Sequence, residues 1–169
     1  MHRLEQLAEQ AEISFVAGES TVLLNGEDVT HAIRTRAMGQ AASQVSAVPG
    51  VRRAMVKSQR AMGLRSSVVM EGRDIGTVVF PEADVKIFLD AQAGERTERR
   101  ARELDVPAQT VADEIRERDH RDRTRAEAPL VQAPDALYVD TTGLSIEAVE
   151  QELLRIIRAR TSNGKERTQ

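Results

Sequence analysis

The 169-residue sequence contains no cysteine and no tryptophan. Without cysteine the chain cannot form disulfide bonds, zinc–thiolate sites or thiol nucleophiles. Aromatic residues make up only 2% of the chain, which is too few for the stacking platforms that bind single-stranded nucleic acid. The three histidines, His2, His31 and His120, are too scattered to match a metal-ligand spacing, and we expect no metal site.

Long apolar runs are also missing. No stretch approaches the roughly 18 apolar residues that a membrane-spanning helix needs, and the first ten residues lack the apolar core of a signal peptide. The net charge of −3 at pH 7 argues against a general binder of polyanions. We therefore expect a cytoplasmic protein that binds neither membranes nor nucleic acids.

The residues that are present are sufficient for a folded domain, with 40% apolar and 30% charged residues. The basic residues are strongly biased, because 21 are arginine and only three are lysine. The planar guanidinium group of arginine can bind phosphate and carboxylate through two hydrogen bonds at once. The bias favours a phosphorylated small-molecule ligand, although a GC-rich genome would also favour arginine codons.

The first part of the chain combines helices with a small β insert. Apolar residues at helical spacing predict a helix over 2–11. Short β-prone runs within 13–30, with an Asn-Gly turn signal at 25–26, predict a compact antiparallel sheet of three strands. Residues 31–62 predict two helices that are separated by a break at 49–50.

The second part of the chain predicts an α/β arrangement. Three short apolar runs that end in polar residues are predicted to be buried parallel strands: 67–70, 85–90 and 136–140. Helical patterns lie between and after these strands: 93–104, 107–125 and 145–160. Such alternation is typical of a parallel sheet that is flanked by helices. The expected fold class is therefore α/β, with the small antiparallel insert ahead of the parallel sheet.

The segment Gly-Arg-Asp-Ile-Gly at 72–76 follows the first of these strands, and ligands of parallel sheets bind beyond the carboxyl ends of the strands. Its glycines let the backbone approach a ligand. Arg73 can pair with a phosphate, and Asp74 can accept a hydrogen bond from a base or a hydroxyl. A loop with a capping aspartate and a surface arginine would give the same pattern, and the spacing alone does not decide between the two.

An arginine-rich stretch occupies residues 116–125. At 100° per residue, four charged residues share one face of a helix: Arg118, Arg121, Asp122 and Arg125. Such a face suits a phosphorylated sugar, because the guanidiniums can take phosphate oxygens and the carboxylate can accept a ribose hydroxyl. The alternative is a solvated helix with ion pairs such as Glu114 with Arg118 and Glu117 with Arg121.

A third group of arginines lies on the helix predicted over 93–104: Arg96, Arg99, Arg100 and Arg102. Glu95 and Glu103 lie four residues from Arg99 and supply helical partners for it. We therefore expect a solvated face here. His120 has no nucleophile nearby in the sequence and is expected on the surface.

Several stretches resemble bacterial cytidylate kinases. The most specific are GRDIGTVVFP, at 72–81, and RDHRDRTRAEAPL, at 118–130. The β insert and three further stretches fit the same family: 39–60, 95–103 and 136–149. The resemblance covers approximately residues 3–160.

The resemblance implies a nucleoside monophosphate kinase fold, in which ATP and Mg²⁺ are used to phosphorylate CMP or dCMP, giving CDP or dCDP. It implies that residues 1–12 are the remnant of a core helix and that 13–30 form the insert on the monophosphate side. Residues 31–160 would form a partial kinase core with a lid segment near 119–129, and 161–169 a polar tail. The family resemblance also implies a monomer.

The same resemblance implies substrate-binding roles around CMP for five residues: Ser43, Arg52, Arg73, Asp74 and Asp122. Among them, Arg73 would hold the acceptor phosphate and Asp122 would lie near the ribose hydroxyls, with the others around the cytosine and the sugar. Arg118 and Arg125 would be catalytic residues near the transferring phosphoryl group.

One family feature is missing from the sequence. No G-x-x-x-x-G-K-[S/T] pattern, whose backbone amides and lysine cradle the ATP phosphates, occurs in the 169 residues. We therefore expect an N-terminally truncated chain that lacks this loop, begins inside a core helix and phosphorylates CMP poorly by itself. Strands that lose a neighbour expose apolar edges, so we also expect instability or self-association.

Two alternatives stay open. The chain could be a non-catalytic remnant that binds CMP or another phosphorylated ligand without ATP turnover. It could also present a basic helix to nucleic acid on an unrelated α/β scaffold, although the net acidity, the scarce aromatics and the interleaved acidic residues argue against that interpretation.

Overall fold

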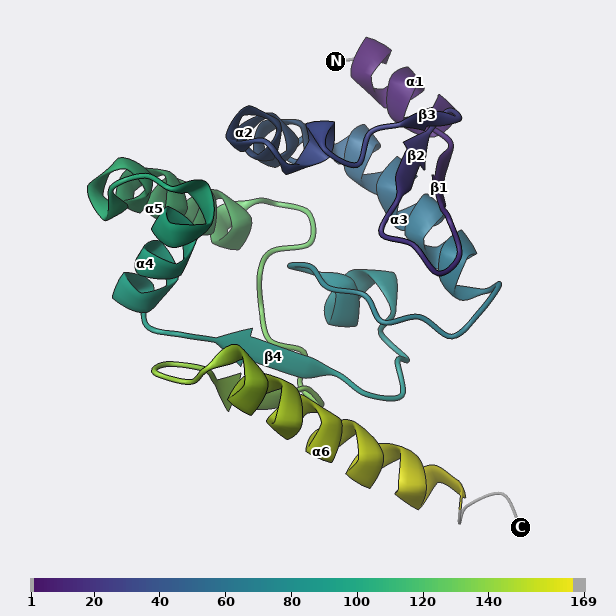
Figure 1. Cartoon of the computed structure of the whole chain (residues 1–169). Helices are drawn as coiled ribbons and strands as arrows, with labels where there is room; N and C mark the ends of the chain where they lie inside the picture. The colour runs from purple at the N-terminus through teal and green to yellow at the C-terminus, as the bar shows by residue number, and fades with distance from the viewer. Residues whose placement is uncertain (1, 166–169) are drawn as a thin grey trace. The chain divides into compact units, whose positions relative to one another are not determined.

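The computed structural model describes residues 2–165 of the chain (Figure 1). These residues belong to two compact units, Met1–Val69 and Met70–Gln169. The units contain a three-stranded antiparallel sheet, a two-stranded parallel sheet and flanking helices, so the expected α/β fold class is confirmed. No helix within the described residues is both long enough and apolar enough to cross a membrane.

The first unit opens with helix α1 (His2–Gln10) and a small antiparallel sheet. The sheet has the order β1-β2-β3, with these bounds: β1 Ile13–Phe15, β2 Val22–Leu24 and β3 Glu27–Asp28. Asn25 and Gly26 turn the chain between β2 and β3, because both adopt the positive φ, 52° and 83°, that a tight hairpin turn requires. The predicted helix at the start of the chain and the predicted three-stranded insert are confirmed.

Two further helices complete the first unit, α2 (Arg36–Val45) and α3 (Pro49–Gly63), after a short 3₁₀ helix η1 (Ala32–Arg34). Thr35 caps α2, because its hydroxyl accepts a hydrogen bond from a backbone amide of the first turn at 3.3 Å. Pro49 begins α3, where proline is favoured because its missing N–H would have no partner. Two helices form, as predicted, but the break lies at 46–48 and not at 49–50, because Pro49 and Gly50 are the first residues of α3.

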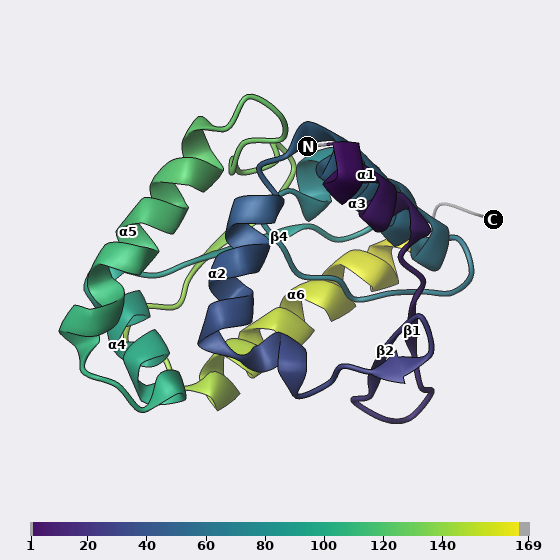
Figure 2. The ribbon, with the colours of Figure 1, turned by 90° about the horizontal axis from the view of Figure 1, so that it is seen from above.

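Helix α1 packs against α3 (Figure 2). Gly50, in the first turn of α3, is buried at this contact. A Cβ atom at Gly50 would lie 2.2 Å from Cδ of Glu5 on α1. The close approach of the two helices therefore depends on a residue without a side chain.

The second unit is built on a two-stranded parallel sheet, in which β4 (Ile87–Asp90) pairs with β5 (Leu137–Asp140). Its helices have these bounds: the π-helix η2 Ile75–Val79, α4 Ala93–Leu104, α5 Ala108–Thr124 and α6 Ile146–Lys165. Helix α4 packs against α5 (Figure 2), and the two helices carry the chain from β4 back to its parallel neighbour. The buried core of this unit includes Val79, Val111 and Val139.

One predicted strand does not form. The prediction of a strand over 67–70 is wrong, because this segment is irregular and Val69 is fully exposed. A strand needs a neighbour that takes its backbone hydrogen bonds, and no described strand pairs with this segment. The parallel sheet within residues 2–165 therefore has two strands.

Helix α6 extends further than the sequence pattern predicts. It continues through Lys165 and does not end near 160, so residues 161–165 are helical where a polar tail was expected. No proline interrupts this stretch, and its polar residues carry only a modest helix penalty, so the helix continues despite the cost of one glycine, Gly164. The last part of the expected tail, 166–169, lies outside the described residues. The assignment of residues 1–12, 13–30 and 31–160 to parts of a kinase stays a prediction.

Candidate functional site

The predicted ligand segment leads directly into a π-helical turn. The carbonyl oxygen of Asp74 accepts hydrogen bonds from the amides of Val78, at 2.9 Å, and Val79, at 3.2 Å, at the start of η2. Single π-helical turns occur often at functional sites. This turn fixes Asp74 and its neighbour Arg73 at the start of a hydrogen-bonded element, whereas the sequence predicted a loop at the end of a strand.

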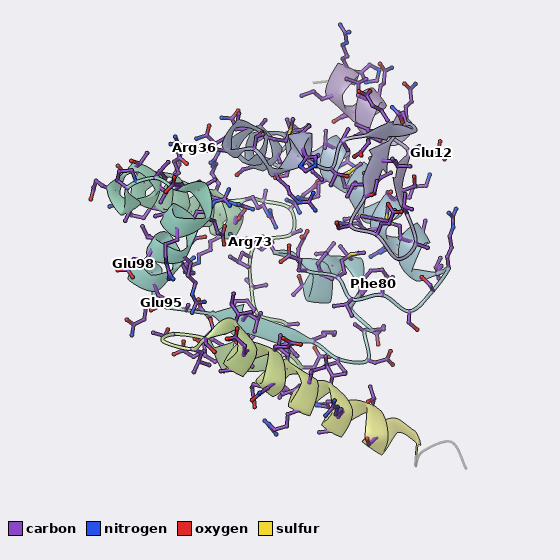
Figure 3. All side chains as sticks on the ribbon, viewed as in Figure 1. Glu12, Arg36, Arg73, Phe80, Glu95 and Glu98 are labelled. Atoms are coloured by element: carbon purple, nitrogen blue, oxygen red, sulfur yellow. The ribbon has the colours of Figure 1, made fainter. Side chains whose placement is uncertain are left out.

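Arg73 (labelled in Figure 3) reaches helix α5 and contacts two buried carboxylates there, Asp119 and Asp122. Asp119 Oδ1 accepts a hydrogen bond from Arg73 Nη1 at 3.2 Å. Asp119 Oδ2 accepts one from Arg96 Nη1 of helix α4 at 2.5 Å. A single carboxylate therefore holds guanidinium groups from two different segments of the second unit.

Asp122 lies among three arginines. Its Oδ2 is 3.5 Å from Arg73 Nε and 3.8 Å from Arg118 Nε, and its Oδ1 accepts a hydrogen bond from Arg125 Nη1 at 3.2 Å. Within the described residues, no group forms a hydrogen bond with the buried Oδ2. Because an unsatisfied buried acceptor is costly, this oxygen is suited to accept a hydrogen bond from a ligand hydroxyl.

Arg125 follows α5 and holds the loop that comes next. Its Nε donates a hydrogen bond to the carbonyl oxygen of Ala128 at 2.5 Å, and its Nη2 lies 3.8 Å from Asp74 Oδ2. The amide of Leu130 donates to the carbonyl oxygen of Asp122 at 2.7 Å. These contacts fold the loop back onto the end of α5. They also bring the carboxylates of Asp74 and Asp122 to the guanidinium of Arg125.

The charges in this cluster do not balance. Ion pairs within 4 Å join four arginines to three aspartates: Arg73, Arg96, Arg118 and Arg125 with Asp74, Asp119 and Asp122. We call these seven residues the arginine cluster. Its excess positive charge favours the binding of an added anion.

The pKa values of two members reflect this crowding. Burial acts to raise the pKa of the Asp119 carboxyl, but the hydrogen bonds and charges of Arg96 and Arg73 outweigh it and lower that pKa below its ordinary value. Burial, followed by the nearby positive charge of Arg73, lowers the pKa of the Arg118 guanidinium. The lowered pKa of Asp119 is thus caused by its arginine partners, whereas the lowered pKa of Arg118 is caused by burial and by a neighbouring like charge.

The structure brings together five of the predicted site residues in the second unit: Arg73, Asp74, Arg118, Asp122 and Arg125. The other two, Ser43 on α2 and Arg52 on α3, lie in the first unit. Ser43 Oγ is buried and has no hydrogen-bond partner within the described part of the chain. Arg52 Nε donates to the carbonyl oxygen of Ser46 at 3.2 Å, which ties the start of α3 to the end of α2.

Two members of the arginine cluster, Arg96 and Asp119, are absent from the predicted site. The prediction of a solvated face is wrong for Arg96, which binds Asp119. For Arg99 it is confirmed in part, because the predicted pair with Glu95 forms at 3.4 Å, but Arg99 Nη2 also donates to the carbonyl oxygen of Thr141 at 2.6 Å. Asp119 and Thr141 lie 23 and 42 residues away in sequence, so helical spacing cannot reveal them. The sequence does contain one signal for Asp119. It lies three residues before Asp122, so the two carboxylates are expected on the same face of the helix.

Other charged residues of α5 pair along the helix, as the alternative interpretation predicts. Arg121 Nη2 lies 4.0 Å from Glu117 Oε1, although Arg121 is half-buried and its Nε has no hydrogen-bond partner among the described residues. His120 is exposed, as expected. Arg116 pairs in a similar way with Asp113, and both side chains are exposed. The arginine cluster therefore uses only part of the arginine-rich stretch.

The described residues contain no preformed cluster of metal ligands. Among residues 2–165, no group of three or more His, Cys, Asp or Glu side chains is placed to hold a metal ion. The 169 residues also contain no G-x-x-x-x-G-K-[S/T] phosphate-loop pattern. The guanidiniums and carboxylates of the arginine cluster can bind a phosphate and a hydroxyl together.

Comparison with known families agrees with this geometry. The model of the family described as cytidylate kinase matches residues 1–159, which is nearly the whole chain. The chain belongs to the cytidylate kinase family. The resemblance inferred from the sequence motifs is thereby confirmed, and the chain is a member of a family of kinases.

Relatives named cytidylate kinase align with most of this chain. One from Solibacter usitatus is 57% identical over 173 residues, which cover 98% of this chain and 74% of the relative. One from Klebsiella pneumoniae is 48% identical over 162 residues, covering 92% and 71%. One from Pseudomonas aeruginosa is 47% identical over 161 residues, covering 90% and 70%. The arginine cluster lies inside the region that the cytidylate kinase family model matches.

Proposed function

We propose that this chain binds CMP or dCMP as the acceptor in ATP-dependent phosphoryl transfer, which gives CDP or dCDP. The observation that carries the proposal is the arginine cluster around the buried Oδ2 of Asp122. The excess of guanidiniums suits a phosphate group, and the carboxylate oxygen without a hydrogen bond suits a sugar hydroxyl. A nucleoside monophosphate carries both groups.

Each member of the cluster has a distinct task in this proposal. Arg73 holds the acceptor phosphate, because two carboxylates anchor it while a third of its side chain stays exposed to a ligand. Arg118 and Arg125 neutralise the charge on the transferring phosphoryl group. Asp122 accepts a hydrogen bond from a ribose hydroxyl, and Asp74 takes part in binding the cytosine or the sugar.

Two residues of the first unit, Ser43 and Arg52, have roles around the cytosine and the sugar in this proposal, as the family resemblance implies. Ser43 Oγ is buried without a hydrogen-bond partner among the described residues, and a hydroxyl can both donate to and accept from a pyrimidine edge. Arg52 is held at the end of α2 by its hydrogen bond to Ser46. These features support a role in recognising the nucleoside part of the acceptor.

The loop after α5 supports the proposed lid near 119–129. It is folded back by two hydrogen bonds, from Arg125 to Ala128 and from Leu130 to Asp122. Loops that close over a substrate gate the reaction in many enzymes. Because Arg125 belongs to both the loop and the arginine cluster, movement of the loop would carry a guanidinium to or from the phosphates.

The ATP side of the reaction has less support in this chain. Catalysis of phosphoryl transfer depends on positioning and charge stabilisation by a phosphate-binding loop and Mg²⁺, and the 169 residues contain no such loop pattern. We therefore expect that the chain by itself binds CMP but phosphorylates it poorly. The second candidate function, a non-catalytic nucleotide-binding protein, has the same acceptor site and the same expected binding.

Two measurements on the purified chain test this proposal. Calorimetric titration with CMP should show binding to one site, and titration with RNA or DNA should show none that depends on salt. A coupled assay with ATP, Mg²⁺ and CMP should show little turnover. Lack of CMP binding would contradict the acceptor role, whereas efficient turnover would contradict only the expected inactivity of the chain by itself.

A further inference from the structure

Asp119, at the start of the proposed lid segment, has no ligand-binding role in the proposed function, although it is the carboxylate that links Arg73 to helix α4. It is buried, and its two oxygens accept hydrogen bonds from different arginines, Arg73 and Arg96. Arg96 is itself fixed, because its Nε donates to the carbonyl oxygen of Ala91 at 3.1 Å, directly after β4. A continuous series of contacts therefore runs from the sheet through Arg96 and Asp119 to Arg73.

We propose that Asp119, braced by Arg96, is a positioning residue that aims the guanidinium of Arg73 at the acceptor phosphate; this inference rests on the proposed function. An arginine side chain samples many rotamers in solution and loses that freedom when it binds a ligand. Within the described residues, Asp119 and Asp122 engage Nη1 and Nε of Arg73, so its remaining edge is available to an anion. The side chain is thus ordered before the ligand arrives.

The charge of the pair supports a positioning role. A lone carboxylate beside Arg73 would order it but would also repel the phosphate that Arg73 is to bind. Arg96 offsets that charge, because its guanidinium lies directly on the second oxygen of Asp119. The pair can therefore hold Arg73 without reducing the net positive charge of the arginine cluster.

A charge-balanced double variant isolates this effect. R96Q/D119N removes one positive and one negative charge together, so the net charge near the phosphate is unchanged and Arg73 loses an anchor. The matched control is D113N/R116Q, which removes another aspartate–arginine pair from α5 whose side chains are both exposed. Each protein is titrated with CMP and with cytidine, which lacks the phosphate, and binding is followed by NMR.

We expect R96Q/D119N to bind CMP about tenfold more weakly than the wild type, equivalent to about 1.4 kcal/mol, with unchanged affinity for cytidine. The control variant should bind both ligands like the wild type. Equal weakening for CMP and cytidine would mean that the pair only supports the fold and would overturn the inference. An unchanged CMP affinity would also overturn it, because Arg73 would then need no anchor.

A second variant keeps the test decisive if the double variant does not fold. R96K preserves the charge but loses the planar fork that holds Ala91 and Asp119 together. It should weaken CMP binding about threefold and leave cytidine binding unchanged, and an unchanged CMP affinity would count against the inference. Failure of the wild-type chain to bind CMP would instead contradict the proposed function and, with it, the inference.

Discussion

Asp122 is the carboxylate that contacts the most guanidiniums in the arginine cluster. Its buried carboxylate has three arginines within 4 Å. Taking a carboxylate and a guanidinium such as that of Arg125 out of water is costly, and their mutual attraction offsets this cost only while both are present. Removal of one partner is therefore more destabilising than the pair is stabilising.

The variant D122N should lower the free energy of unfolding by about 2 kcal/mol. The loss is smaller than for a fully buried pair because two of the three arginines, Arg73 and Arg118, have side chains 33% and 49% exposed and can be solvated. Inorganic phosphate should stabilise D122N more than the wild type, since it can neutralise the arginines that lose their carboxylate. Urea unfolding with and without phosphate, followed by circular dichroism, measures both effects.

The control for this experiment is D113N, which removes an exposed carboxylate from the same helix. Its unfolding free energy should stay within about 0.5 kcal/mol of the wild-type value, with or without phosphate. If phosphate stabilises D122N and the wild type equally, the arginine cluster does not bind anions in the way that we propose.

The candidate site could be predicted from the sequence only in part. Arg73, Asp122 and Arg125 lie in short, specific motifs, and the structure brings them together as the motifs imply. The contact of Arg96 with Asp119 joins two helices across 23 residues. No local pattern contains that information, because the contact is created by the packing of α4 against α5.

At the scale of whole elements, the packing of α1 on α3 depends on the absence of a side chain at Gly50. The variant G50A should lower the unfolding free energy by about 1 kcal/mol, because the new Cβ would collide with the Glu5 side chain and force it to move. In an E5A background the same substitution should instead raise it by about 0.5 kcal/mol, since alanine is a better helix former than glycine.

G50A is thus expected to lower the unfolding free energy when Glu5 is present and to raise it when Glu5 is replaced by alanine. This change of sign separates the effect of the steric contact from that of intrinsic helix propensity. Urea unfolding of the four proteins in this cycle, the wild type, the two single variants and the double variant, gives the coupling between Gly50 and Glu5. If G50A changes stability in the same direction in both backgrounds, the contact between α1 and α3 does not limit the size of residue 50.

Elements that depend on a local signal could be predicted, and those that depend on a partner could not. The Asn25-Gly26 turn and the bounds of α4 follow from turn chemistry and amphipathic spacing. Proline signals the region of the helix boundary at 49, but the prediction placed a break where α3 begins. Residues 67–70 carry a strand pattern but form no strand. Their β propensity has no effect among the described residues, because no neighbouring strand takes their hydrogen bonds.

At the scale of the whole molecule, the chain exposes several large apolar side chains: Phe15, Leu64, Val69 and Ile146. Within the described residues, the parallel sheet also has only two strands, so both β4 and β5 present an edge without a neighbouring strand. Exposed apolar segments and unpaired edges are the features through which proteins associate with copies of themselves. We therefore expect the chain to self-associate as its concentration rises.

Val69 offers the sharpest test of this expectation, because its side chain is fully exposed and contributes nothing to the core. V69K should leave the unfolding free energy within about 0.5 kcal/mol of the wild-type value and should reduce self-association in sedimentation velocity over a range of concentrations. S66K adds the same charge at a nearby exposed polar residue and should reduce self-association less. Equal effects of the two substitutions would show that charge repulsion alone keeps the chains apart, and that the exposed apolar side chains of Val68 and Val69 take no part in their contact.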